Sequence, residues 1–399
     1  MKILMVNKFL YPRGGCETYM LNLAQELKNK GHEVEYFGMY DEKNTVGNSL
    51  GLYTTNMDFH SKGLARFFYP FKIIFSFEAY KKISKVLDDF KPDIVHMNNI
   101  NFQLTPSVIY AIKKRNIPLV QTVHDYQMIC PNHLLYSFNE TKPCERCING
   151  SKFNCFKHSC IHGSKIKSLI GAIEAKLYKL LKTYKKVDLY ICPSKFLEEK
   201  LLSASNVFSG KTVAIHNFIE KKTLPENATT KPYIAFASRL SKEKGVTLLA
   251  EAAKMLPQYE FVVAGNGPDD EDLKNIPNVT MKGFLTGNEL ITLIANSKVM
   301  ILPSVWYENC PLNILETHSF GVPVITMNSG GMAELVNDGE TGLLVNEPTP
   351  EAIANAIEKC FSDEEFYNNL RLNCEKRSKE IAEVGAYCDI IVKKYQELI

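Results

Sequence analysis

Two cations in the second half of the sequence have the spacing of a site for a diphosphate. Arg239 and Lys244 lie in the segment 238–245, which follows an apolar run and precedes a helical pattern. Basic side chains at the start of a helix favour an anionic ligand, because the helix dipole and the free backbone amides attract negative charge as well. A solvated basic turn has the same composition, so this segment alone leaves both interpretations open.

Two carboxylates, Glu308 and Glu316, flank a second expected helix start. Proline is favoured at the first helical position, so Pro311 places Glu308 in the preceding loop and Glu316 about one and a half turns inside the helix. One carboxylate can then face the sugar of a ligand while the other reaches its ribose, with free helix amides between them. An exposed acid pair at a helix start would show the same spacing.

Glycine-rich turns follow several of the expected strands. They are Gly14–Gly15, 265–268 and 329–331. Glycine lets the backbone approach a ligand closely, although each turn taken alone is more often only a tight turn. All of these segments fall at strand ends, which is where α/β sheets bind ligands.

The elements that position these residues alternate between strand and helix along the chain. Apolar runs at 3–6, 34–37, 93–97, 118–123 and 188–192 alternate with helical patterns, and a second such series begins at 233. The pattern predicts an α/β protein with two Rossmann-like doubly wound domains facing a cleft. We expect domains at 1–217 and 233–374, a linker at 218–232, and a final helix at 375–399 that returns to the first domain.

Composition excludes several other classes of protein. The chain has 399 residues, of which 45% are hydrophobic and 23% charged, and its formal net charge is +3. These values are ordinary for a folded protein and give no strong pull toward nucleic acid. The apolar start is broken by Lys8, so no signal peptide is expected, and we predict a cytoplasmic protein.

Taken together, these segments are similar to the retaining glycosyltransferases of family 4, which have the two-domain GT-B fold. The likeness covers nearly the whole chain. It depends on the segments 14–17, 124–125, 238–245, 265–268, 303–316, 321–324 and 329–331.

The resemblance implies a nucleotide-sugar donor, with UDP or GDP, and a role for each matching residue. Arg239 and Lys244 would neutralise the donor diphosphate, Glu308 would position hydroxyls of the transferred sugar, and Glu316 would bind the ribose. His124 would line the sugar end of the cleft from the first domain, although a histidine satisfied at a strand end is the plainer interpretation. The other expected donor-binding residues are Gly14, Gly15, Gly265, Gly283, Phe284, Asn309, Cys310 and Leu312.

No catalytic metal is expected. Cations and helix amides can stabilise the departing diphosphate, and the acidic run 269–272 is better explained as complementing a helix dipole. For retention of configuration we favour a front-face route, in which the leaving phosphate accepts the proton of the acceptor, over a carboxylate nucleophile.

An insertion at about 128–163 carries five cysteines, including a Cys-x-x-Cys pair. By likeness to a subset of the family, a structural zinc site is expected, with an iron–sulfur cluster as the alternative and reduced thiols in an ordinary loop as the plainer interpretation. The expected ligands are Cys130, Cys144, Cys147 and Cys160.

Partners follow from the same patterns. The acceptor expected from the family is a glycan or lipid-linked glycan of a cell-surface polysaccharide. The segment 165–186 has seven lysines and one acid, and 64–83 is rich in aromatic residues, so peripheral binding to an anionic membrane is expected, with a core-packed helix as the equal alternative. The alternative functions are a GT-B sugar-nucleotide epimerase and a nucleic-acid-binding module.

Overall fold

The computed structural model describes residues 1–56, 69–220, 222 and 229–399, without the side chains of 69–71. Part of the aromatic segment predicted at 64–83 and most of the linker predicted at 218–232 therefore lie outside the described residues. The chain folds into two compact units. Unit 1 contains Met1–Leu135, Cys144–Asn217 and Val384–Ile399, and unit 2 contains Tyr136–Pro143 and Phe218–Glu383.

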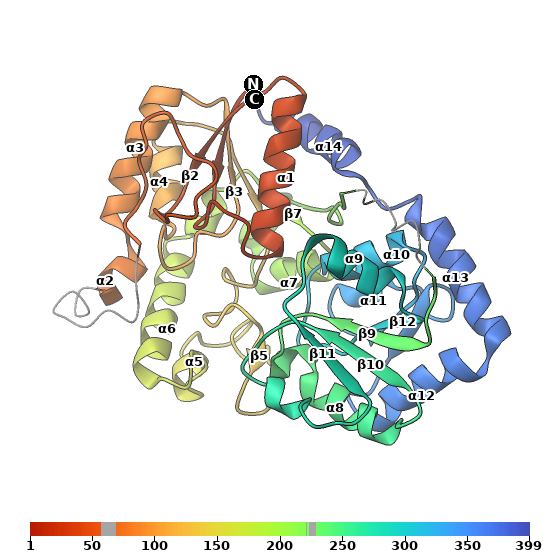
Figure 1. The fold of residues 1–399 in the computed structure, drawn as a ribbon. Helices are drawn as coiled ribbons and strands as arrows, with labels where there is room; N and C mark the ends of the chain where they lie inside the picture. The colour runs from red at the N-terminus through yellow and green to blue at the C-terminus, as the bar shows by residue number, and fades with distance from the viewer. Residues whose placement is uncertain (57–68, 221, 223–228) are drawn as a thin grey trace. The chain divides into compact units, whose positions relative to one another are not determined.

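Unit 1 is built on a six-stranded parallel sheet (Figure 1). Its spatial order is β2 (Glu33–Phe37), β1 (Lys2–Val6), β3 (Ile94–Met97), β4 (Leu119–Thr122), β7 (Leu189–Cys192) and β8 (Thr212–Ala214). The short central strands β3 and β4 are buried along their whole length and β1 from Ile3 onward, as expected for a parallel sheet covered on both faces. The order reverses between β1 and β3, so a ligand crevice is expected at the ends of these two strands.

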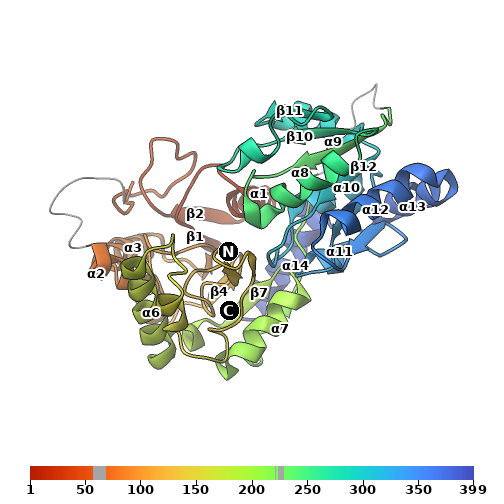
Figure 2. The same ribbon diagram turned by 90° about the horizontal axis from the view of Figure 1, so that it is seen from below.

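Helices cover both faces of this sheet. Helix α1 (Gly15–Asn29) contacts α14 (Val384–Gln396), whereas α3 (Phe77–Phe90) contacts α4 (Ser107–Lys113) on the other face (Figure 1). Helix α2 (Tyr69–Ile74) contacts α6 (Lys165–Leu180), and both lie with α3 at the periphery of unit 1 (Figure 2). The remaining helices of this unit are α5 (Asn154–Lys157) and α7 (Lys195–Ala204).

Unit 2 also has a six-stranded parallel sheet, in the strand order of a Rossmann fold. The order is β11 (Val279–Gly283), β10 (Glu260–Ala264), β9 (Tyr233–Ala237), β12 (Val299–Leu302), β13 (Val324–Met327) and β14 (Gly342–Val345). The helices are α8 (Val246–Met255), α9 (Gly287–Ala295), α10 (Leu312–Ser319), α11 (Met332–Leu335), α12 (Pro350–Ser362) and α13 (Glu364–Ser378). The prediction of two doubly wound α/β sheets is thus confirmed.

The single helix predicted at 375–399 is wrong, because the chain breaks between α13 and α14. The Ile219 amide donates to the Ala382 carbonyl at 3.0 Å, and Ile219 forms a parallel bridge with Glu383. Residues 382–383 are therefore extended and cannot continue α13. A local helical pattern does not reveal this pairing with a segment far away in the sequence.

Strands β5 (Tyr136–Ser137) and β6 (Lys142–Pro143) form an antiparallel hairpin inside the predicted cysteine-rich insertion. A search of the described residues finds no helix with the length and hydropathy needed to cross a membrane.

Candidate active site

The charged residues of unit 2 gather where its strand order reverses. Strands β9 and β12 are neighbours in the sheet, with Ile234 beside Val299. Lys244 lies in the loop that follows β9, and Glu308 lies in the loop between β12 and α10. The carboxyl ends of these two strands are the place where an open α/β sheet binds its ligand.

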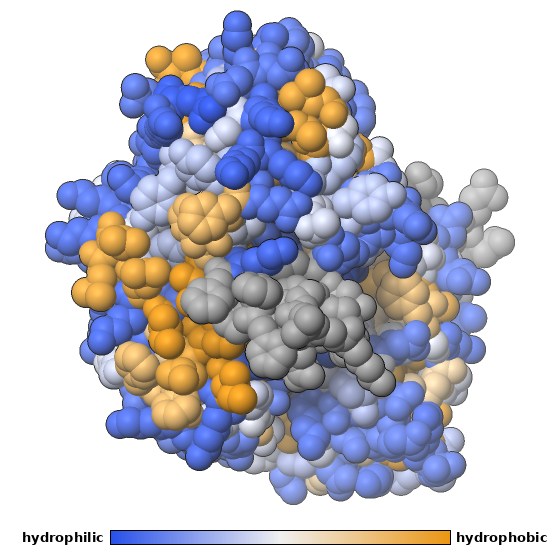
Figure 3. Space-filling model, turned by 90° about the vertical axis from the view of Figure 1, so that its left-hand side faces the viewer, coloured by the Kyte–Doolittle hydropathy of each residue, from blue (hydrophilic) through white to orange (hydrophobic). Residues whose placement is uncertain are grey.

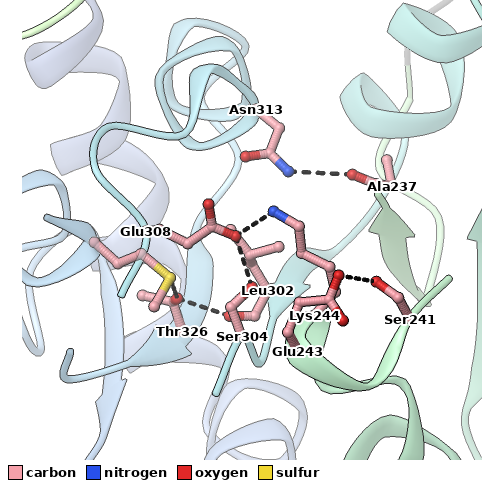
Figure 4. Close-up of polar contacts among 10 residues, drawn as sticks. Ala237, Ser241, Glu243, Lys244, Leu302, Ser304, Glu308, Asn313 and Thr326 are labelled. Carbon is pink, nitrogen blue, oxygen red and sulfur yellow. Dashed lines mark hydrogen bonds and ion pairs between the residues drawn. The ribbon is translucent and has the colours of Figure 1, made fainter. Parts of the chain in front are cut away.

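Lys244 and Glu308 form an ion pair across this switch point, in which Glu308 is buried and Lys244 is partly buried (Figure 4). The Lys244 Nζ contacts Glu308 Oε1, and the Ser304 hydroxyl donates to the same oxygen at 3.0 Å. The Glu308 residue is only 7% exposed, and the Lys244 ammonium lies 5.0 Å from the centre of the Trp306 ring. Removing one partner of a buried pair leaves an uncompensated charge, so the two side chains hold each other in place.

Glycine allows the loops around this pair to pack closely. Gly245 has φ +78°, and a Cβ built on it would lie 1.9 Å from the Pro303 carbonyl oxygen. Gly330 has φ +61°, its Cβ would lie 2.6 Å from the Glu308 carbonyl oxygen, and the Gly331 amide donates to that oxygen at 2.7 Å. The turn 329–331 therefore fixes the backbone of Glu308, a contribution that its glycines make without any ligand.

The other predicted donor-site residues of unit 2 differ in their exposure and in their partners. Arg239 is exposed and has no hydrogen-bond or ion-pair partner among the described residues. Glu316 lies on α10 and pairs with Lys222 at 2.5 Å, so a ribose hydroxyl would compete with that ammonium. Phe284 is 72% exposed, whereas Cys310 is buried.

The start of α10 offers backbone donors beside the ion pair. Pro311 is the N-cap of this helix and makes no side-chain cap, and Leu312 is the first helical residue. The Asn313 side chain donates to the Ala237 carbonyl at 3.1 Å and so ties α10 to the end of β9 (Figure 4). Asn309 lies in the loop just before this helix start. These amides and Arg239 together favour an anionic ligand.

Gly265 follows strand β10, and Gly283 is the last residue of the neighbouring strand β11. A Cβ on Gly265 would lie 1.9 Å from the Ser238 carbonyl oxygen, and the Gly265 amide donates to the Gly283 carbonyl at 2.7 Å. Both glycines have positive φ values, +138° and +66°. Gly265 packs closely against the loop after β9, whereas a Cβ on Gly283 would meet no atom within 4 Å.

In unit 1, the predicted residues lie at the ends of β1 and β4. Gly14 is the N-cap of α1, and Gly15 is the first residue of this helix. The His124 Nε2 hydrogen-bonds to Asn98 Oδ1 at 2.9 Å, and the Tyr19 ring lies edge-on to the His124 ring, 5.0 Å away. Burial lowers the pKa of His124 to about 4, so its imidazole is neutral at pH 7.

Three histidines with lowered pKa values make unit 1 sensitive to acid, two of them buried (His96 and His133) and one partly buried (His124). Burial lowers the pKa of His96 to about 3 and the pKa values of His124 and His133 to about 4. Between these values and the unfolded pKa near 6.5, only the unfolded chain binds the protons, so stability rises with pH in this window. Each histidine contributes a slope of roughly 1.4 kcal/mol per pH unit.

We therefore expect the urea midpoint, followed by circular dichroism, to fall clearly between pH 7 and pH 5. The variant His124→Asn should show a smaller fall, because it removes one of the groups that only the unfolded chain protonates. Equal midpoints at the two pH values would contradict this account of the buried histidines.

The structure does not support the predicted metal site. All eleven cysteines are free thiols, and in the described ranges no three His, Cys, Asp or Glu side chains are grouped to hold a metal ion. Cys147 and Cys155 instead pack with Ala172 in a small apolar cluster. Burial raises the pKa of Cys130 to about 12, and its Sγ donates to Asn132. The prediction rested on likeness and Cys-x-x-Cys spacing, which do not fix the loop geometry. The four residues concerned are Cys130, Cys144, Cys147 and Cys160.

Sequence reasoning missed four residues that shape these sites. Ser304 and Trp306 directly follow β12, so their place at a strand end was a usable signal. Asn98 directly follows β3 and carries the same signal, whereas Lys222 carries no local signal. Lys222 meets Glu316, which is 94 residues away, and Asn98 meets His124 only because β3 and β4 are neighbours in the sheet.

Two parallel α/β sheets, with a charge pair and an uncapped helix start at one switch point, define a doubly wound α/β protein whose strand ends suit an anionic ligand. The sequence model described as Glycosyltransferase Family 4 matches residues 13–222, and the one described as Glycosyl transferases group 1 matches residues 218–380. The chain belongs to glycosyltransferase family 4 and has the GT-B fold. It is a glycosyltransferase.

Named relatives agree with this assignment. An uncharacterised glycosyltransferase of Methanocaldococcus jannaschii is 25% identical, over 94% of this chain and 93% of the relative. The O-antigen biosynthesis glycosyltransferase WbnH of Escherichia coli is 26% identical, over 59% of this chain and 67% of the relative. The structure of Anabaena HepE in complex with UDP matches with a TM-score of 0.71 at 18% identity, over 100% of both chains.

Proposed function

We propose that this protein is a retaining glycosyltransferase that takes a sugar from a UDP or GDP donor. The ion pair of Lys244 and Glu308 at the β9–β12 switch point carries this proposal. One cation fixed beside one carboxylate suits a ligand that is anionic at its diphosphate and rich in hydroxyls at its sugar. The UDP complex of HepE supports a nucleotide-bound donor.

The chemistry assigned to these residues is charge stabilisation. As the bond from the anomeric carbon to the phosphate oxygen breaks, negative charge grows on the diphosphate and positive charge on the sugar ring. Arg239, Lys244 and the open amides of α10 stabilise the diphosphate. Glu308 positions the sugar hydroxyls. Glu316 gives up its contact with Lys222 and binds the ribose hydroxyls instead.

Retention is assigned to a front-face displacement. The acceptor oxygen bonds to the anomeric carbon on the side that the phosphate leaves, and the acceptor proton passes to a leaving phosphate oxygen. His124 lines the sugar end of the donor. Because its imidazole is neutral, it acts there through a hydrogen bond and not through a positive charge. The phosphate accepts the proton, so the step balances without a carboxylate nucleophile.

We propose that transfer needs no metal ion, because carboxylates of the acidic run 269–272 already accept hydrogen bonds from neighbouring residues. The Lys242 amide donates to Asp269 Oδ2 at 3.0 Å, and the Thr247 hydroxyl donates to Asp272 Oδ2 at 2.7 Å. These carboxylates stabilise the loop after β9 and the start of α8. The positive charge at the diphosphate then comes from Arg239 and Lys244.

The acceptor is proposed to be a glycan or lipid-linked glycan of a cell-surface polysaccharide. WbnH, which is named for O-antigen biosynthesis, supports this class. The first domain is proposed to hold the acceptor, with His124 and Asn98 at the ends of β4 and β3 nearest to it.

A nucleotide screen tests the proposal. Thermal unfolding is measured with UDP-sugars, GDP-sugars, UDP and GDP, and with uridine and guanosine as controls that lack the diphosphate. A ligand present at about 100 times its Kd stabilises the folded chain by about 2.7 kcal/mol. We expect one diphosphate series to raise the Tm and its nucleoside to leave the Tm unchanged, with turnover that persists in a chelator. No shift with any nucleoside diphosphate would refute the proposed donor.

A further inference from the structure

Helix α6 in unit 1 turns its small residues inward. Ser168, Gly171 and Ala172 are buried. The Ser168 hydroxyl accepts the Ile161 amide at 2.9 Å, and a Cβ on Gly171 would lie 2.5 Å from Ile161 Cδ1. Only small side chains allow α6 to lie this close to the cysteine-rich loop, so this face of the helix is already packed.

The opposite face of α6 presents large aliphatic side chains to solvent. Residues 166, 173, 177 and 180 are separated by seven, four and three positions, which places them on one stripe of a helix with 3.6 residues per turn. Ile166 is 73% exposed and Leu180 is 69% exposed. Ile173, Leu177 and the C-cap residue Leu181 are exposed as well.

This distribution is the reverse of an ordinary surface helix, which buries its aliphatic stripe and exposes its polar face. The space-filling view of this side of unit 1 shows an apolar area with hydrophilic side chains next to it (Figure 3). A contiguous exposed apolar patch of this kind marks an interaction surface. The alternative interpretation, a core-packed helix with a solvated lysine face, describes the inner face and the lysines but not the exposed aliphatic stripe.

The charges around the stripe are all positive. Seven lysines lie between 165 and 186, and none of them forms an ion pair with a described residue. Lys165, Lys167 and Lys176 flank the stripe at about a quarter turn on either side. The only acid of the segment, Glu174, is buried, and burial raises its pKa to about 8, so the surface carries no negative charge from this helix at pH 7.

We propose that the outward face of α6 lies in the interface of an anionic lipid bilayer, with Ile166, Ile173, Leu177 and Leu180 among the acyl chains and the flanking lysines at the headgroups. An apolar stripe between basic side chains is the pattern of a helix that lies in the plane of a membrane. A second copy of the chain is disfavoured, because pairing this face with itself would bring the lysines together. The proposal is independent of the donor site.

Vesicle binding of the full chain tests this inference. Sedimentation is compared between vesicles of phosphatidylcholine with about 30% phosphatidylglycerol and vesicles of phosphatidylcholine alone, at low and high salt. We expect binding to the anionic vesicles only, and weaker binding as salt screens the lysines. The variant Leu177→Ser/Leu180→Ser should lose at least about tenfold in partition coefficient, because two large apolar side chains no longer enter the bilayer.

A matched variant separates this face from general surface hydrophobicity. Leu202→Ser/Leu372→Ser removes two leucines that are 43% and 53% exposed elsewhere, and it should bind as the wild type does. Both variants are checked for unchanged Tm. Equal loss in the two variants, or no binding to anionic vesicles, would overturn the proposal. A dimer in solution that depends on Leu177 and Leu180 would also overturn it, since the face would then belong to a second copy.

Discussion

Lys244→Ala is expected to lower kcat/KM for sugar transfer by a factor of about 10³, the upper range for losing one fixed group that stabilises developing negative charge. The ammonium of Lys244 is held by Glu308 and lies over the Trp306 ring, so it is already oriented before any ligand binds. Alanine removes the cation and also leaves the Glu308 carboxylate buried without its charge partner. Steady-state kinetics with the donor identified by the nucleotide screen measures the effect.

Lys242→Ala is the matched control for this variant. Lys242 belongs to the same short 3-10 helix, Lys242–Lys244, but its side chain is exposed and it contacts the acidic run only through its backbone amide. Lys242→Ala therefore removes one positive charge from the same loop as Lys244→Ala does. If Lys242→Ala lost as much activity as Lys244→Ala, the general charge of the loop, not the buried pair, would account for the effect.

Glu308→Gln should lower kcat by about 10² or more while the protein stays folded. Glutamine keeps the shape and one carbonyl oxygen for the Ser304 hydroxyl. It loses the negative charge that fixes the Lys244 ammonium and that opposes the positive charge forming on the sugar ring. The backbone of residue 308 should not move, because the Gly331 amide holds its carbonyl.

Glu316→Gln provides the contrast to Glu308→Gln. It breaks the pair with Lys222 and weakens the proposed ribose contact, so it should raise KM for the donor more than it lowers kcat. A covalent glycosyl group trapped on residue 308 in the wild type would replace the front-face route with a carboxylate nucleophile. Unchanged kcat in Glu308→Gln would remove Glu308 from the chemistry.

Much of the fold could be predicted because its signals are local. The strands found at Ile94–Met97 and Leu119–Thr122 lie within the predicted runs 93–97 and 118–123, and the second series begins at Tyr233, where it was predicted. Short apolar runs between helical patterns are typical of parallel strands that are buried on both faces. Pro311 correctly indicated that Glu308 precedes α10 and that Glu316 lies within it.

The parts that could not be predicted depend on contacts between distant segments. The Lys222–Glu316 pair joins two residues 94 positions apart, and the break before α14 follows from the pairing of Ile219 with residues 382–383. The sequence pattern of α6 shows an aliphatic stripe but not which face the fold covers. Cys-x-x-Cys spacing likewise does not show whether further thiols come close enough to share a metal.

The site in unit 2 was predicted in part because its residues cluster along the chain. The segments 238–245 and 303–316 each follow a strand directly, and neighbouring strands bring them together. The direct contact between Lys244 and Glu308 was not predicted, and it changes the interpretation of both residues. Each is the structural partner of the other before either meets a substrate.

A crystal soaked with the nucleoside diphosphate selected by the thermal screen tests the central claim most directly. We predict electron density for the two phosphates within hydrogen-bonding distance of the Arg239 guanidinium and the Lys244 ammonium, beside the first amides of α10. Density for the diphosphate bound elsewhere, with Arg239 and Lys244 in contact only with solvent and protein, would contradict the account.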